Sequence, residues 1–144
     1  MRYKVNHVNG LYFELVDDNG KNREYNVAFL DANKNKIYES KLRPGGWSKL
    51  DRKYLSDITI VVTHENGTVL KEIRVLDEIP GKKVFISFES KSLGDTLAWL
   101  PYCLEMRNYY KCRVVVSTFH NELFEKVYPE LQFVGRGKVV HDLF

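Results

Sequence analysis

The hydrophobic pattern of this 144-residue chain changes near Pro80-Gly81, and this change most limits the folds that the chain can adopt. Before it, apolar residues alternate with polar ones, which is typical of strands with one buried face. After it, Val84-Phe85-Ile86 and Val114-Val115-Val116 are continuously apolar, as expected for parallel strands that are covered on both faces. The pattern therefore predicts a domain boundary close to Pro80.

Residues 1–79 are predicted to form a small antiparallel β-sandwich or barrel, because short alternating runs are separated by turn formers. The runs lie near residues 11–16, 25–29, 58–62 and 69–75. Asn66-Gly67 supplies the positive φ angles of a tight hairpin turn between the last two runs. Pro44-Gly45-Gly46 is predicted to form a wider crossing loop, with Trp47 capping one end of the core.

Residues 80–144 are predicted to form the start of a Rossmann-like α/β domain, so the overall class is α+β. The two continuous runs and a third, Leu131-Gln132-Phe133-Val134, alternate with helical patterns in the order β-α-β-α-β. Pro101 is expected to bend the first helix, and the second helix must end before Pro129. The expected apolar faces are Leu93, Leu97, Leu100 and Leu104 in the first helix, and Leu123, Phe124 and Val127 in the second.

Composition excludes several classes of function. The net charge is only +3, without the clustered Lys and Arg of a nucleic-acid-binding surface. No signal peptide and no apolar stretch of about 20 residues is present, so we expect a cytoplasmic protein without a membrane span. Cys103 and Cys112 are expected to be buried free thiols, and the four histidines lack metal-ligand spacing, so no metal site is predicted. P-loop, dinucleotide and serine-hydrolase motifs are also missing.

The loop Glu89–Asp95 joins the first parallel strand to its helix, where α/β proteins bind ligands. Ser92 is a candidate helix N-cap, and Asp95 can either accept the N–H of the cap residue or point outward. Gly94 allows a ligand to approach the first turn. The helix dipole favours an ionised carboxylate, and an outward carboxylate there is a competent general base. The alternative is that Ser92 and Asp95 are only a capping pair.

The second strand-to-helix turn, Ser117 to Asn121, carries the one histidine near this predicted cleft. His120 can reach the same cleft as Asp95 if the carboxyl ends of the two strands meet at one edge. The alternative is that Asn121 caps the second helix and that His120 is an exposed loop residue.

Three segments together resemble a known family. FISFESKSLGDTLAWLPY (residues 85–102), VVVSTFHNELF (residues 114–124) and YPELQFVG resemble the start of the catalytic region of bacterial autotransporter O-heptosyltransferases of the strand-loop-strand type. They are more distantly similar to lipopolysaccharide heptosyltransferases, which have an S-x-G-D turn after the first strand. The resemblance covers essentially the whole chain, since family members carry a small N-terminal β-domain before the glycosyltransferase core.

The resemblance implies a GT-B glycosyltransferase that takes heptose from ADP-heptose, with inversion, to a serine hydroxyl of an autotransporter passenger protein. The family's general base corresponds to Asp95 in this sequence. The residues expected to contact substrate are Ser90, Lys91 and Ser92 in the cleft, Gly94 and Thr96 beside the base, and His120 from the second turn. No cofactor is expected within this chain, because ADP-heptose is a donor substrate of the complete enzyme.

Length is the departure from the family, because the 64 residues after Pro80 are less than one typical domain. We therefore expect an N-terminal piece of a longer enzyme, either truncated or a shortened gene product, that does not turn over alone. The alternatives are a non-catalytic module that binds a protein or glycan, and transfer of a different sugar by the same architecture. Unpaired strand edges also make a homo-oligomer possible.

Overall fold

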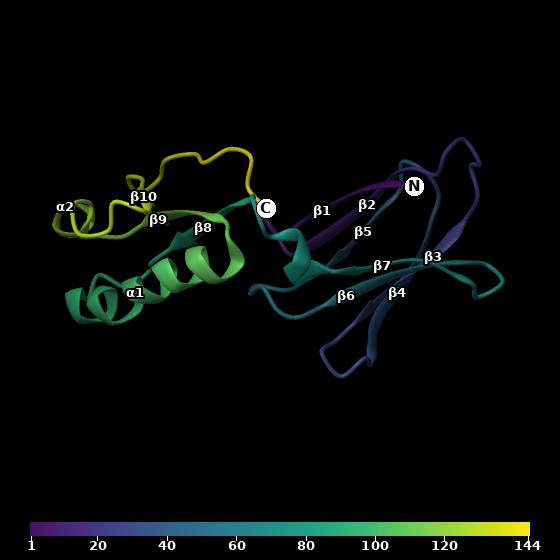
Figure 1. Ribbon diagram of the computed structural model, residues 1–144, viewed down its shortest axis with the longest axis horizontal. Coiled ribbons are helices and arrows are strands. Elements are labelled where there is room, and N and C mark those ends of the chain that lie inside the picture. The colour runs from purple at the N-terminus through teal and green to yellow at the C-terminus, as the bar shows by residue number, and fades with distance from the viewer. The chain divides into compact units, whose positions relative to one another are not determined.

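The computed structural model describes residues 1–144 and divides into two compact units, Met1–Glu78 and Ile79–Phe144 (Figure 1). The chain is mostly β, with ten strands in three sheets and little helix. The change in hydrophobic periodicity near Pro80 lies at the division between the two units.

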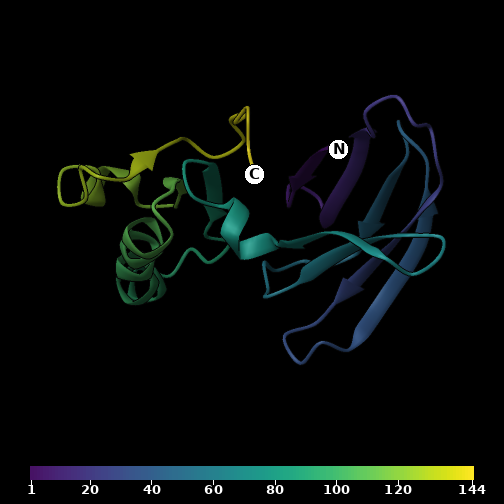
Figure 2. The same cartoon turned by 45° about the vertical axis from the view of Figure 1, so that its right-hand side comes forward.

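The first unit consists of two antiparallel sheets. The three-stranded sheet has the order β1-β2-β5, and the four-stranded sheet has the order β4-β3-β6-β7. The strands are β1 (Arg2–Asn6), β2 (Leu11–Asp17), β3 (Tyr25–Leu30), β4 (Lys36–Leu42), β5 (Trp47–Leu50), β6 (Thr59–His64) and β7 (Val69–Arg74). A short 3-10 helix, η1 (Val75–Glu78), ends the unit. Figure 2 shows the three-stranded sheet lying over the four-stranded sheet.

The core of the first unit follows the alternation that the sequence predicts. In β2 and β3 every second side chain is buried, and β6 adds two of its own to the same core. The fully buried side chains from these strands are Leu11, Phe13, Leu15, Tyr25, Val27, Phe29, Ile60 and Val62. Because successive side chains of a strand point to opposite faces, one sheet face is apolar and the other faces solvent.

The Asn66-Gly67 hairpin is confirmed, but its two central residues behave differently. Gly67 has a φ of 87°, while Asn66 is not among the residues with positive φ. The Asn66 side chain instead accepts a hydrogen bond from the Thr68 N–H at 3.0 Å. Asparagine therefore acts here through its side-chain oxygen, and only the glycine needs the left-handed backbone.

The prediction that Trp47 caps the core is wrong. Arg43 to Gly46 cross from β4 in one sheet to β5 in the other in a tight turn, since the Gly46 N–H donates to the Arg43 carbonyl at 2.8 Å. The first residue of β5 points outward, so Trp47 is 58% exposed and stacks on Tyr12, while Ser48 takes the buried position. Strand alternation therefore overrode the hydrophobicity of the tryptophan.

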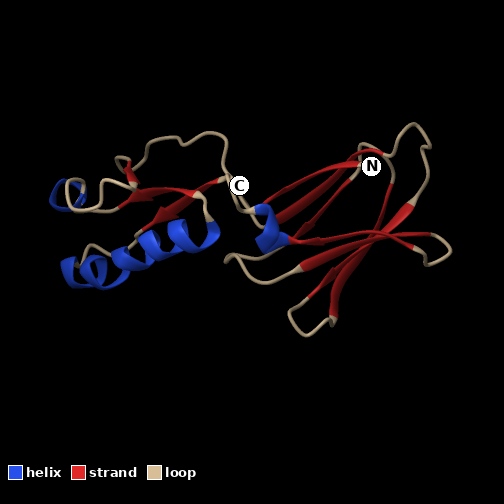
Figure 3. Ribbon diagram, viewed as in Figure 1, coloured by secondary structure: helices blue, strands red, loops and turns tan.

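The second unit contains one parallel sheet of the order β10-β9-β8. Its elements are β8 (Lys83–Ser87), α1 (Leu93–Tyr110), β9 (Arg113–Ser117), α2 (Asn121–Phe124) and β10 (Gln132–Phe133). Figure 3 shows α1 running along one face of this sheet. The central strand β9 is buried from Val114 to Ser117, as its continuous apolar run predicts.

The predicted apolar face of α1 is right in part, since Leu100 is buried and Leu104 is half-buried. The buried residues are Thr96, Leu100 and Cys103, whereas Leu93 and Leu97 are exposed. Apolar and aromatic residues occur nearly all around this helix, so their spacing predicts a helix without identifying the side that meets β9. The helix continues through Pro101 to Tyr110.

The second helix is short and ends before Pro129, as predicted, but buries only Phe124 of its three expected apolar residues. Leu123 and Val127 are exposed. Cys103 and Cys112 are buried free thiols, also as predicted. Neither helix combines the length and the apolar character that crossing a bilayer requires.

Candidate functional site

The carboxyl ends of β8 and β9 lie side by side, because Ser87 pairs with Ser117 in parallel register. Residue Gln132 of β10 pairs with Val115, so the third strand ends at the same edge. Ligands of parallel α/β sheets bind outside this edge, where loops lead into helices. The loops at residues 88–92 and 118–120 and the segment after β10 therefore form the candidate site.

The first turn of α1 places Asp95 at this edge. Ser92 is the N-cap, with an extended backbone, and its Oγ accepts a hydrogen bond from the Asp95 N–H at 3.3 Å. Thr96 is buried, and its Oγ1 donates to the Ser92 carbonyl at 3.1 Å. Asp95 itself is exposed. The cap therefore fixes the first turn through Ser92 and Thr96, and leaves the Asp95 carboxylate at the surface.

The Asp95 carboxylate does not accept the N–H of its own cap residue. Its Oδ2 accepts a hydrogen bond from the Ser90 hydroxyl at 2.8 Å, and the Ser92 N–H donates to the Ser90 Oγ at 3.1 Å. Ser90 thus stands between the two members of the expected capping pair. The sequence left two orientations of Asp95 open, and neither included this intermediate hydroxyl.

Gly94 has no neighbour that requires a glycine. A Cβ at this position would meet only the Ser92 Oγ, at 3.6 Å, an ordinary contact, and the backbone φ of Gly94 is not positive. The space beside the first turn of α1 is therefore open to a ligand.

His120 reaches the loop that precedes α1. Its Nε2 lies 2.8 Å from the Lys91 carbonyl oxygen. A carbonyl only accepts, so Nε2 carries the hydrogen in this contact. His120 thereby joins the two strand-to-helix loops, while the Lys91 ammonium lies 5.7 Å from the centre of the Phe119 ring.

Asn121 does not cap α2, contrary to one of the alternatives that the sequence left open. Its Oδ1 accepts from the Thr118 N–H at 2.9 Å and from the Thr118 hydroxyl at 2.8 Å, and its Nδ2 donates to the Val134 carbonyl at 2.8 Å. The N-cap position belongs to His120, which makes no side-chain cap bond. Asn121 thus ties the second loop to the segment after β10.

The sequence reasoning missed Arg136 and Phe119. The Arg136 guanidinium carbon lies 3.9 Å from the centre of the Phe119 ring, and its Nη1 donates to the Phe88 carbonyl at 2.6 Å. A cation stacked on an aromatic face gains electrostatic attraction to the ring. The only sequence signal was position, because Arg136 follows the third apolar run and so arrives at the same edge as Asp95.

Ser117 contributes a second unusual feature to the edge. Its hydroxyl is buried at the end of β9 and has no hydrogen-bond partner in the structure. The neighbouring Thr118 hydroxyl, by contrast, both donates to Asn121 and accepts from the His120 N–H at 3.0 Å. Ser117 is therefore the one unsatisfied buried side chain in an otherwise bonded set of loops.

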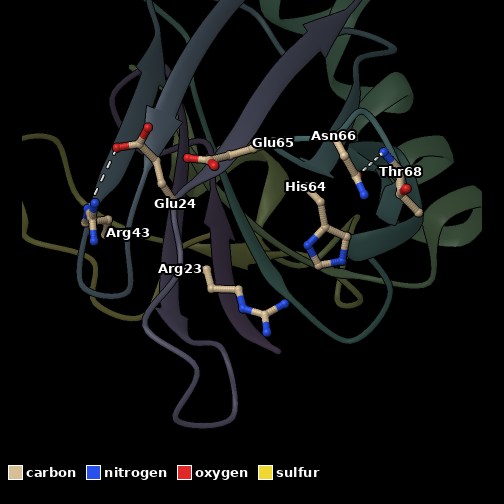
Figure 4. Close-up of a pocket in the computed structure, with 7 residues that line it drawn as sticks. All are labelled: Arg23, Glu24, Arg43, His64, Glu65, Asn66 and Thr68. Atoms are coloured by element: carbon tan, nitrogen blue, oxygen red, sulfur yellow. Dashed lines mark hydrogen bonds and ion pairs between the residues drawn. The ribbon is translucent and has the colours of Figure 1, made fainter.

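A pocket of about 550 Å³ lies in the first unit and contains none of the site residues predicted from the sequence (Figure 4). Charges of both signs line it, and part of them are paired, since Arg43 lies 3.7 Å from Glu24. The ring of His64 is tilted against that of Tyr25, with 5.4 Å between ring centres. The lining residues are Arg23, Glu24, Arg43, His64, Glu65, Asn66 and Thr68.

Burial controls the chemistry of the two thiols in the second unit. Desolvation raises the pKa of Cys103 to about 11 and also raises the pKa of Cys112. Both are therefore protonated near neutral pH and are poor nucleophiles and poor metal ligands. No three His, Cys, Asp or Glu side chains in the chain are grouped so that they could hold a metal ion.

No protein-family model matches the chain. Among curated proteins, autotransporter heptosyltransferase TibC of Escherichia coli O78:H11 (strain H10407) is 30% identical over 115 residues, which are 76% of this chain and 27% of TibC. Autotransporter heptosyltransferase Aah of Escherichia coli is 26% identical over 134 residues, which are 88% of this chain and 34% of Aah.

Solved structures agree with these relatives. The crystal structure of the iron-containing dodecameric glycosyltransferase TibC from enterotoxigenic E. coli H10407 matches with a TM-score of 0.68 and 25% identity, over 96% of this chain and 35% of that chain. The structure of TibC in complex with ADP-D-beta-D-heptose matches with a TM-score of 0.67 at 23% identity, and so supports the fold alone. The chain thus spans about a third of the length of the proteins that it matches.

Proposed function

Because the chain is a homologue of the autotransporter heptosyltransferases, we propose that it forms the acceptor side of an enzyme that transfers heptose from ADP-heptose to a serine hydroxyl of an autotransporter protein. The observation that carries this proposal is the exposed Asp95 carboxylate, held by Ser90 at the carboxyl edge of the parallel sheet. A carboxylate at this place meets the geometric requirement for a general base, which is access to the proton that it removes.

In the proposed reaction the acceptor serine oxygen attacks C1 of the heptose. The new C1–O bond forms as the bond between C1 and the ADP oxygen breaks, and ADP leaves with the electron pair of that bond. The attacking oxygen and the ADP oxygen lie on opposite sides of C1, so the configuration at C1 is inverted. The serine proton passes to the Asp95 carboxylate as the new bond forms. A serine hydroxyl is a weak nucleophile near neutral pH, so removal of its proton in the transition state lowers the barrier.

The second unit serves in this proposal as the start of a Rossmann-like domain of the GT-B type. Its three parallel strands have the order β10-β9-β8, with α1 and α2 in the connections, which supports that interpretation. The first unit would be the β-sandwich that precedes it. Since the chain spans about a third of its relatives, we place the donor site largely outside these residues and expect no turnover by residues 1–144 alone.

The crystallised TibC is an iron-containing glycosyltransferase, but the residues of this chain do not fit a metal site. The two cysteines are buried thiols, and no cluster of three ligands exists. We propose that the enzyme works in the cytoplasm and, by analogy with the dodecameric TibC, as a homo-oligomer.

The proposal is tested in a chimera in which residues 1–144 replace the matching segment of E. coli TibC. With ADP-heptose and an acceptor autotransporter, the chimera is expected to transfer heptose, detected by mass spectrometry of the acceptor. Asp95→Asn is expected to lower kcat by about a thousandfold or more while the chimera still binds donor. A folded but inactive chimera beside active TibC, or full activity of Asp95→Asn, would overturn the proposal.

A second function, binding without catalysis by the first unit, is favoured by one observation. Trp47 and Tyr12 form a stacked aromatic pair on the outer face of the three-stranded sheet, with ring centres 5.9 Å apart. Aromatic side chains at a surface, here the exposed Trp47 beside the half-buried Tyr12, are suited to a protein or glycan partner. Binding of acceptor by residues 1–144 that is lost in Trp47→Ala and retained in Asp95→Asn would favour this function.

A further inference from the structure

The two oxygens of the Asp95 carboxylate have different surroundings. Oδ2 accepts the hydrogen bond from the Ser90 hydroxyl at 2.8 Å. Oδ1 receives no hydrogen bond from any protein group, and the side chain is exposed. One oxygen is therefore occupied, and the other is free to meet a hydroxyl from solution.

The direction of the Ser90 bond is fixed by a third group. A serine hydroxyl has one hydrogen to donate and lone pairs that accept. The Ser92 N–H donates to the Ser90 Oγ at 3.1 Å, and a carboxylate can only accept. The Ser90 hydrogen is therefore directed to Asp95, in a hydrogen bond to a charged acceptor, which is stronger than one between neutral groups.

The backbone on both sides of Ser90 is anchored to other segments. Arg136 donates to the Phe88 carbonyl at 2.6 Å, and the His120 Nε2 contacts the Lys91 carbonyl at 2.8 Å. Phe88 also donates its N–H to the Ser117 carbonyl at 2.9 Å. Ser90 therefore belongs to a loop that is attached to the sheet edge, whereas Asp95 belongs to helix α1.

From this geometry we infer that Ser90 is a positioning residue for the base: it holds Oδ2 of Asp95 and leaves Oδ1 as the atom that takes the acceptor proton. The inference rests on the proposed function of Asp95. In the transfer step the acceptor proton moves to Oδ1, while the Ser90 hydrogen stays on its own oxygen. A base held in one orientation reacts faster, because misplacement by about 1 Å can cost on the order of a hundredfold in rate.

The chain offers matched serine controls. Ser87 is exposed and makes no side-chain hydrogen bond, and Ser92 caps α1 without touching the carboxylate. In the chimera, Ser90→Ala is expected to lower kcat by about ten- to a hundredfold with both KM values within about twofold, and Ser90→Thr is expected to restore kcat. Ser87→Ala should leave kcat and KM unchanged. Ser92→Ala should lower the Tm, and should lower kcat by less than Ser90→Ala does.

A second measurement follows the carboxylate without any turnover. In residues 1–144, three-bond NMR couplings to the Asp95 carboxyl carbon report its χ1 angle. A single rotamer is expected in the wild type and in Ser90→Thr, and an average over rotamers is expected in Ser90→Ala. Ser87→Ala is expected to match the wild type.

These two measurements separate the inference from the function on which it rests. An unchanged rotamer together with an unchanged kcat in Ser90→Ala would overturn the positioning role. A rise in KM at constant kcat would also overturn it, because Ser90 would then bind substrate directly. If Ser90→Ala frees the rotamer but Asp95→Asn retains transfer, the positioning stands and the role of Asp95 as base is lost.

Discussion

The two units of this chain differ in the size of the side chains that they bury and in how many large apolar side chains they leave exposed. In the first unit, Phe13, Val27 and Phe29 from two facing sheets are completely buried. In the second unit, helix α1 leaves Leu97 at 56% and Tyr109 at 80% exposure, and buries only three residues. A sheet with a second sheet on its inner face encloses its core, while a helix on a small sheet covers only one narrow side.

The residues that contribute most to stability and the residues proposed for catalysis therefore lie in different units. The large buried side chains are concentrated in the first unit, which contains none of the proposed catalytic residues. The second unit carries Asp95 on the first turn of α1, beside loops whose positions depend on hydrogen bonds from Ser90, His120 and Arg136. Binding and catalytic residues are commonly held on loops at the edge of a scaffold, where polar contacts rather than core packing fix them.

The largest effect is expected from truncation in the core of the first unit. Phe13→Ala should lower the free energy of unfolding of this unit by about 3–5 kcal/mol, since it removes a fully buried ring and leaves a cavity. Urea unfolding followed by circular dichroism measures the change. Tyr109→Ala removes an equally large but exposed ring from α1 and should change stability by about 0.5 kcal/mol or less. Equal effects of the two substitutions would contradict the comparison.

A smaller effect is expected within α1, where two leucines three residues apart differ in burial. Leu100 is completely buried, whereas Leu97 is more than half exposed. Leu100→Ala should therefore destabilise the second unit by about 2–4 kcal/mol, and Leu97→Ala by less than about 1 kcal/mol. Hydrogen exchange of the β9 amides measures the stability of this unit. A larger loss from Leu97→Ala than from Leu100→Ala would contradict the side of α1 that the structure places against the sheet.

The sequence correctly predicted those features that depend on residues close together in the chain. The alternation in β2 and β3 predicted their buried faces, and the Ser92 cap was predicted from its place before the first turn of α1. The Asn66-Gly67 turn was predicted from residues that are adjacent in sequence. In each case the residues that decide the structure lie within a few positions of one another.

Contacts between distant segments could not be predicted in the same way. The facing side of α1 depends on β9, and the contacts of Arg136 depend on Phe119 and on Phe88, which lies 48 residues away. Ser90 was predicted to line the cleft, but its bond to Asp95 required the actual path of the loop. Hydrophobic period and motif spacing contain no information on these pairings.

The loop before β3 provides a pH-dependent test of the first unit. Asp18 is buried and accepts hydrogen bonds from the Asn22 and Arg23 N–H groups, both at 2.9 Å, and from the Tyr25 hydroxyl at 3.3 Å. Burial alone would raise the pKa of Asp18, but these donors together hold it below the usual value.

A lowered folded-state pKa fixes the sign of the effect. The stabilisation from Asp18 is complete above the unfolded pKa of about 3.9 and is lost as pH falls through the folded pKa. Asp18→Asn should lower the Tm at pH 7 and flatten its dependence on pH below about 4. The exposed Asp51→Asn is the control. If the Tm of Asp18→Asn falls with pH below about 4 as steeply as the Tm of the wild type, this assignment is wrong.

The smallest effect is expected at alkaline pH from the pair Tyr3 and Glu78, whose hydrogen bond measures 2.8 Å. Burial, followed by the Glu78 carboxylate, raises the pKa of Tyr3 to about 12. A raised pKa stabilises the protonated phenol, so this contribution is complete below the unfolded pKa of about 10 and is lost as pH rises towards 12. Tyr3→Phe should lower the free energy of unfolding by about 1 kcal/mol near pH 8. It should also remove part of the decrease in that free energy between about pH 10 and 12, and urea unfolding measures both changes. Tyr54→Phe, at an exposed tyrosine without a hydrogen-bond partner, should change neither quantity. An alkaline loss of the same size in Tyr3→Phe as in the wild type would assign that loss to another group.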